Sequence, residues 1–135
     1  MRLHAFQSCF SVGSTGREGN VTDSIFRVDG KVALVTGGSK GLGIAMARGL
    51  ASFGAKVVLS ARDPGELAAA VASIESEGGS AAFVAADLSL RPEAERLARA
   101  CSEPFGPIDI LVNNAGINIV QPIEGIRDED WDRVL

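Results

Sequence analysis

The sequence predicts an α/β fold in which helices cover both faces of a doubly wound parallel β-sheet. Beyond residue 30, short apolar runs alternate with longer segments whose apolar residues recur at helical spacing. The chain has 135 residues, of which 46% are hydrophobic and 22% charged, a balance typical of one globular domain.

The first predicted unit is a strand, a helix and a second strand. The apolar runs at 31–36 and 55–60 predict buried strands, and Gly54 is suited to end the helix between them. The helix, expected over 42–53, would bury one apolar face made of Leu42, Met46, Leu50 and Phe53.

The second unit begins at Asp63 and Pro64, an N-cap followed by a first-turn proline. The helix that they open would bury Leu67, Val71 and Ile74 before it ends at Gly78 and Gly79, and a third strand follows at 81–85.

The third unit is a helix over about 92–102 and a fourth strand at 108–112. The buried face of this helix would consist of Ala94, Leu97, Ala98 and Cys101. Asp128 can cap a last helix with Trp131 and Leu135 on one face, and the chain ends about two turns later. We therefore expect a Rossmann-like sheet that is truncated after the fourth strand and the start of the following helix.

Residues 1–27 have no helical or strand period and are expected to be a flexible tail, which leaves 28–135 as the domain. His4 and Cys9 lie in this tail, and as isolated residues they indicate neither a nucleophile nor a metal site.

Charge and cysteine usage exclude several classes of partner. The net charge is −4, without a basic cluster that would indicate nucleic acid or a membrane surface. Cys9 and Cys101 lack metal-binding spacing and are expected to be free thiols in the cytoplasm. No apolar run approaches the roughly 20 residues of a membrane span.

A glycine-rich stretch, Thr36-Gly-Gly-Ser-Lys-Gly-Leu-Gly43, lies between the first strand and the first helix. This is where a dinucleotide fold holds the diphosphate against free N–H groups of the helix. A Walker loop is excluded, because Lys40 precedes a glycine and no hydroxyl residue follows it at the required position.

Together with Asn113-Asn114-Ala115-Gly116 after the fourth strand and Asp87-Leu88 after the third, this stretch resembles the short-chain dehydrogenase/reductase family over about residues 28–135. The resemblance implies that Asp87 contacts the adenine amino group, that Leu88 lies beside the ring, and that residues 114–116 line the adenosine ribose. The expected cofactor-binding residues are Gly37, Ser39, Lys40, Gly41, Leu42, Gly43, Arg62, Asp87, Leu88, Asn114, Ala115 and Gly116. Alternatively, Asp87 is a cap or turn residue and the two asparagines are turn amides.

The cofactor is expected to be NADP(H) rather than NAD(H). Where an NAD site has an acid at the end of the second strand, this chain has Ala61, followed by Arg62, and Lys40 lies in the glycine-rich stretch. Two cations would suit a 2′-phosphate. Asp63 could instead meet the 2′-hydroxyl, and Arg62 and Lys40 could be solvated loop charges.

The resemblance implies hydride transfer between nicotinamide and a carbonyl or alcohol, with the stretches at 114–118 and 128–131 most similar to reductases of sugar acids, polyols or 3-oxoacyl groups. The family's Tyr-x-x-x-Lys motif is absent, because the chain has no tyrosine, so we assign no catalytic residue and no metal ligand. We expect this chain alone to be inactive, and the complete enzyme to be a homo-oligomer. The alternative is a catalytically silent nucleotide-binding or association module.

Overall fold

The computed structural model describes residues 25–134, except for the side chains of 131–133. The predicted tail up to residue 24, with His4 and Cys9, lies outside the described residues, as does Leu135. The elements are β1 (Val32–Thr36), α2 (Gly41–Ser52), β2 (Lys56–Ser60), α3 (Pro64–Ser76), β3 (Ser80–Phe83), α4 (Arg91–Ala100), β4 (Ile110–Val112), the 3-10 turn η1 (Ile123–Gly125) and α5 (Asp128–Val134).

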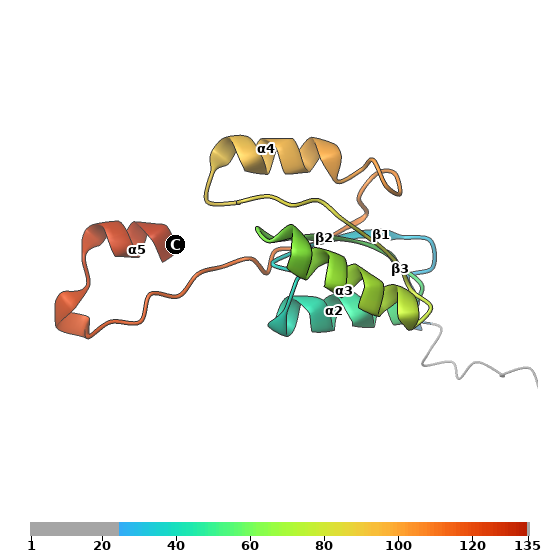
Figure 1. Ribbon diagram of the computed structural model, residues 1–135, viewed down its shortest axis with the longest axis horizontal. Coiled ribbons are helices and arrows are strands. Elements are labelled where there is room, and N and C mark those ends of the chain that lie inside the picture. The colour runs from blue at the N-terminus through green and yellow to red at the C-terminus, as the bar shows by residue number, and fades with distance from the viewer. Residues whose placement is uncertain (1–24, 135) are drawn as a thin grey trace, which may run out of the picture.

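The described strands form one parallel sheet in the order β3-β2-β1-β4, with α2 and α3 on one face and α4 on the other (Figure 1). This confirms the predicted doubly wound architecture. All of β1 is buried, because helices cover the sheet on both sides of this central strand.

Alternate residues of β1 point to opposite faces and build two separate cores. Ala33 and Val35 belong to the core that includes Leu67 and Ile74 of α3, whereas Val32 and Leu34 belong to the core around α4. The stripe predicted for α3 and the inward positions of Leu97 and Cys101 are confirmed, since Leu67, Ile74, Leu97 and Cys101 are all buried and Val71 packs on the first core.

The inner face predicted for α2 is wrong at Leu42 and Phe53, whereas Leu50 packs against the first core as predicted. Leu42 and Phe53 are 70% and 39% exposed, and the buried residues of the helix are Gly43 and Ala47. At its first turn the helix lies so close to the glycine-rich turn that Gly43 has no space for a side chain, and Ile44 and Leu50 pack on the core farther along the helix. Ala98 of α4 is likewise exposed, contrary to the prediction.

After β4 the chain runs away from the sheet to η1 and α5 (Figure 1). Several apolar side chains of this segment are exposed, among them Ile117, Val120, Ile123 and Ile126. The predicted last helix is present as α5, with Asp128 as its first residue. Across residues 25–134, no helix combines the length and the apolar character needed to cross a membrane.

Candidate functional site: the crevice at the end of β1

The candidate site lies at the carboxyl ends of β1 and β4. Along the chain, β2 and β3 are added on one side of β1, and β4 is then added on the other side. Open α/β sheets bind ligands in the crevice at such a reversal of strand order. The loops after β1 and β4, which begin at Gly37 and Asn113, therefore flank the crevice.

The hydroxyl of Thr36 joins these two loops. Its Oγ1 accepts hydrogen bonds from the backbone N–H groups of Asn114 and Ala115, both at 3.0 Å, and donates to the carbonyl of Val112 at 3.3 Å. Thr36 is only 3% exposed. A buried side chain thus fixes the start of the 114–116 loop against the start of the glycine-rich turn.

The side chain of Asn114 reinforces the same junction. Its Nδ2 donates to the carbonyls of Thr36 at 3.0 Å and Gly37 at 3.3 Å. The amide therefore supports the turn from beneath, which is the structural role that the sequence left open. Ala115 and Gly116, the other residues expected at the ribose, are exposed beside it.

The turn itself depends on glycine at two points. Gly37 has a φ of +63°, in the left-handed region that glycine adopts without a steric penalty. A Cβ on Gly43 would lie 2.1 Å from the carbonyl oxygen of Gly37 and 2.8 Å from Nδ2 of Asn114. The first turn of α2 therefore packs directly on the glycine-rich turn, with no space for a side chain between them.

The beginning of α2 differs from that of α3. At α3, Asp63 Oδ1 accepts from the N–H groups of Gly65 at 2.8 Å and Glu66 at 3.0 Å, which confirms the predicted cap. At α2, the N-cap residue Lys40 makes no capping side-chain hydrogen bond, and the first turn contains no acid. The N–H groups at the start of α2 are thus left for an anion, and they carry the positive end of the helix dipole.

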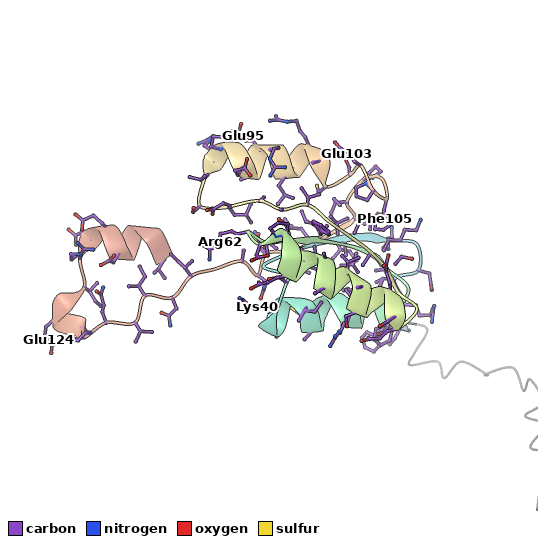
Figure 2. The ribbon with its side chains drawn as sticks, in the orientation of Figure 1. Lys40, Arg62, Glu95, Glu103, Phe105 and Glu124 are labelled. Carbon is purple, nitrogen blue, oxygen red and sulfur yellow. The ribbon has the colours of Figure 1, made fainter. Side chains whose placement is uncertain are left out.

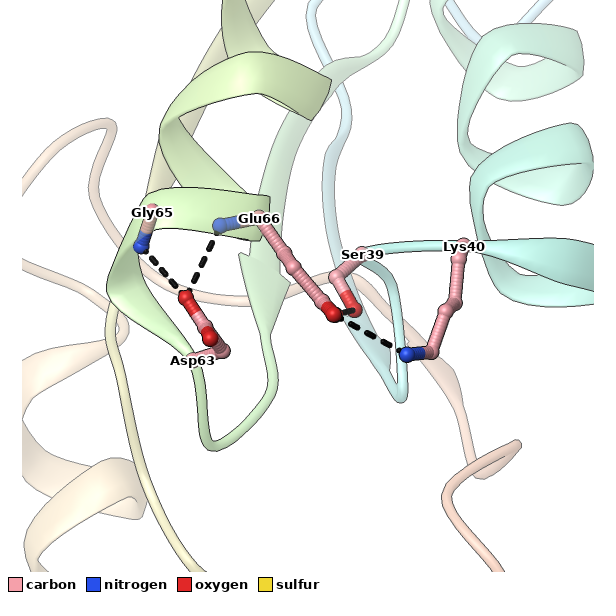
Figure 3. A network of polar contacts seen from close by, with 5 residues as sticks. All are labelled: Ser39, Lys40, Asp63, Gly65 and Glu66. Carbon is pink, nitrogen blue, oxygen red and sulfur yellow. Dashed lines mark hydrogen bonds and ion pairs between the residues drawn. The ribbon is translucent and has the colours of Figure 1, made fainter.

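The cations expected at the 2′-phosphate have different neighbours. Lys40 Nζ forms an ion pair with Glu66 Oε1 at 3.0 Å, and Ser39 Oγ donates to Glu66 Oε2 at 2.9 Å (Figure 3). The hydrogen bonds from Lys40 and then Ser39 hold the pKa of Glu66 below its ordinary value. Arg62, exposed after β2, lies on the same side of the molecule as Lys40 (Figure 2).

Asp87 and Leu88 occupy the loop after β3. Asp87 Oδ1 accepts from the backbone N–H of Ser89 at 3.0 Å and from its hydroxyl at 2.7 Å. These two bonds, with a smaller contribution from the charge of Arg62, lower the pKa of Asp87. Oδ1 of Asp87 therefore holds the turn at Ser89, whereas its second carboxylate oxygen accepts neither of these bonds. Leu88 packs against the core around α4.

Sequence reasoning missed two residues of this site. The sequence pattern gives Thr36 no role, because its hydroxyl bonds join positions that are 78 and 79 residues apart in the chain. Glu66 carried no signal beyond being an acid in the first helical turn, which the helix dipole alone explains. Within the described part of the chain, no group of three or more acidic, histidine or cysteine residues could hold a metal ion.

Comparison with known proteins matches the part of the chain that contains the sheet and the candidate site. The family model described as "short chain dehydrogenase" matches residues 31–135. Gluconate 5-dehydrogenase of Gluconobacter oxydans is 40% identical over 111 residues, which are 82% of this chain and 43% of that protein. The chain thus spans less than half the length of such relatives.

The chain is also similar to solved structures of reductases. A 3-oxoacyl-(acyl-carrier-protein) reductase from Agrobacterium tumefaciens with NADP bound matches with a TM-score of 0.74 and 37% identity, over 86% of this chain and 44% of that one. L-Sorbose reductase from Gluconobacter frateurii, complexed with NADPH and L-sorbose, matches with a TM-score of 0.71 and 38% identity, over 78% of this chain and 40% of that one.

Proposed function

The chain belongs to the short chain dehydrogenase family, and from that premise we propose that it carries the dinucleotide-binding part of an NAD(P)-dependent oxidoreductase. The observation that carries the proposal is the uncapped start of α2, packed without a side chain against the glycine-rich turn. This arrangement fits a diphosphate, which needs free N–H donors and a close approach to the backbone.

The residues of the crevice would share the work of binding. The turn from Gly37 to Gly43 would hold the diphosphate, and the loop at 114–116 would line the adenosine ribose. Asp87 and Leu88 would lie at the adenine. Because Thr36 and Asn114 bond these loops to one another, they would act by positioning the loops.

We propose NADP(H) as the preferred cofactor. Ala61 stands where an acid would bind the ribose 2′-hydroxyl of NAD, and Asp63, the alternative acid, serves as the cap of α3. Arg62 and Lys40 would receive the 2′-phosphate. The NADP and NADPH complexes of the two similar structures support this choice.

When bound, the nicotinamide supplies or accepts a hydride, and the substrate would be a carbonyl or alcohol of the sugar-acid, polyol or 3-oxoacyl type. Gluconate, L-sorbose and 3-oxoacyl groups in the names of the relatives support this range. The 135 residues include no tyrosine, so we propose that they bind and orient the cofactor without protonating a substrate. The buried free thiol of Cys101 is compatible with the cytoplasm, and we propose a homo-oligomer for the complete enzyme.

The test is to measure the dissociation constants of NADPH and NADH by calorimetry for the unmodified protein and for Arg62→Ala. We expect NADPH to bind more tightly, and Arg62→Ala to weaken NADPH roughly ten- to a hundredfold, as expected for a lost charge-assisted hydrogen bond of about 1.5–3 kcal/mol. NADH should change little. Arg99→Ala, which removes an exposed arginine from α4, is the matched control.

Two results would count against the proposal at different levels. If the folded protein binds neither dinucleotide, the oxidoreductase assignment of this site is wrong. If it binds both equally, only the NADP preference is wrong. No carbonyl reduction is expected from the 135-residue chain in either case.

A further inference from the structure

Glu66 connects two elements of the proposed nucleotide site. It stands in the first turn of α3, yet its two carboxylate oxygens bind Ser39 and Lys40 of the glycine-rich turn (Figure 3). The cap formed by Asp63 fixes the backbone of Glu66 through its N–H, at 3.0 Å. Glu66 is therefore held in place both at its backbone N–H and at its carboxylate.

The pair is open to a ligand. The side chains of Lys40 and Glu66 are 78% and 41% exposed, and together with Ser39 they border a groove of about 470 Å³ between α2 and α3. An incoming phosphate can therefore reach Lys40 Nζ, and it meets the charge of Glu66 at the same place.

This placement treats the two cofactors differently. A 2′-phosphate carries a charge of about −1.5 to −2 near neutral pH. It would be repelled by Glu66 and would compete with Glu66 for Lys40. NADH has no such group, and its ribose hydroxyls could donate to the same carboxylate. With the ribose bound beside Lys40, Glu66 would thus supply an acid from the first turn of α3, beyond the end of the second strand where such an acid usually lies.

On the basis of the proposed NAD(P) function, we infer that Glu66 is a selectivity residue that limits the preference for NADPH over NADH by neutralising Lys40. It acts through Lys40 on the 2′-phosphate and takes no part in the reaction itself. The bias toward NADPH would therefore be smaller than Arg62 and Lys40 alone would produce, and loss of the Glu66 charge would increase it.

The experiment compares the unmodified protein with Glu66→Gln, which keeps the size and one acceptor oxygen of the side chain and removes its charge. We expect the dissociation constant of NADPH to fall by about two- to fivefold, the range of one exposed ion pair. That of NADH should not fall. Glu75→Gln removes one charge from the far end of the same helix and should leave the ratio unchanged.

Two nucleotide fragments isolate the effect. Adenosine 2′,5′-bisphosphate and 5′-AMP differ in the 2′-phosphate and lack the nicotinamide, so their affinity ratio should rise in Glu66→Gln as the dinucleotide ratio does. In a Lys40→Met background the gain should shrink. A general structural disturbance by Glu66→Gln would weaken all four nucleotides together and would not raise either ratio.

Each outcome decides between the two proposals. If the unmodified protein binds NADPH and the ratio of NADPH to NADH affinity is the same in Glu66→Gln, the role of Glu66 is overturned and the oxidoreductase assignment stays intact. If Glu66→Gln raises NADPH affinity just as much in the Lys40→Met background, Glu66 does not act through Lys40. If neither dinucleotide binds the unmodified protein, both proposals are wrong. Should Glu66→Gln fail to fold, Glu66→Ala tests the same charge with a stronger helix former.

Discussion

A pair of glycine substitutions in α2 tests whether the glycine-rich turn is held by close packing. We predict opposite effects for Gly43→Ala and Gly49→Ala, although both introduce the same methyl group into the same helix. At Gly43 the new Cβ would lie 2.1 Å from the carbonyl oxygen of Gly37, whereas at Gly49 nothing lies within 4 Å.

The magnitudes follow from these distances. In an open helical position, alanine is more favourable than glycine by about 0.8–1 kcal/mol, so Gly49→Ala should stabilise the protein by up to that amount. At Gly43 the turn or the helix must move, and overpacking of this kind costs about 1–3 kcal/mol. The two variants should therefore differ by about 2–4 kcal/mol in free energy of unfolding.

Urea unfolding followed by circular dichroism measures this difference, and calorimetry with NADPH and NADH measures its consequence for the site. Gly43→Ala should weaken both dinucleotides, because the contacts that it disturbs, at Gly37 and Asn114, would serve the diphosphate and adenosine that both cofactors share and not the 2′-substituent that distinguishes them. Gly49→Ala should bind both as the unmodified protein does. Equal stability and equal binding of the two variants would refute the close-packing argument.

Substitutions at Thr36 and Asp109 test hydrogen bonds at the two ends of β1. Thr36→Val removes the acceptor of the Ala115 N–H and should destabilise the protein by about 1–3 kcal/mol, measured by urea unfolding. Thr36→Ser keeps the hydroxyl and should recover most of this stability. Equal losses in the two variants would contradict the role of the hydroxyl. Asp109 accepts hydrogen bonds from Val32 N and Lys31 Nζ, and these bonds lower the pKa of its carboxyl group below the ordinary 3.8. The contribution of Asp109 to the free energy of unfolding is therefore present above pH 3.8 and is lost as the pH falls through the lowered pKa. The urea midpoints of the unmodified protein and Asp109→Asn should therefore differ at pH 7 and converge as the pH falls below 3.8, and a constant difference would exclude this origin.

The order of the strands and helices could be predicted because it depends on local pattern. Within the predicted run at 31–36, residues 32–36 form a fully buried strand, and Asp63 before Pro64 caps α3, since both signals act within a few residues. The inner face of α2 could be predicted from periodicity only in part, because Leu50 packs on the first core but Leu42 does not. Leu42 has the more apolar side chain, but the distance between helix and turn selects Gly43 for the inner face.

The candidate site was predictable in position and only partly in detail. The loops after β1, β3 and β4 could be identified because ligand sites follow the carboxyl ends of parallel strands. The partners of Lys40 and Thr36 could not, because Glu66 and Asn114 are brought to them only by the packing of whole elements. The side-chain direction that decides whether Lys40 is free or paired is a tertiary property.

The strand order also determines when the crevice can form during folding. The segment from β1 to β3 pairs neighbouring strands through short crossovers, as in Ala33 with Val57. By contrast, β4 pairs with β1 across the whole length of this segment, as in Ala33 with Ile110. Contacts between distant parts of a chain form at a greater entropic cost and tend to come late. We therefore expect the sheet to assemble first from β1 to β3, and the crevice of the candidate site to close last, when β4 brings Asn114 to Thr36.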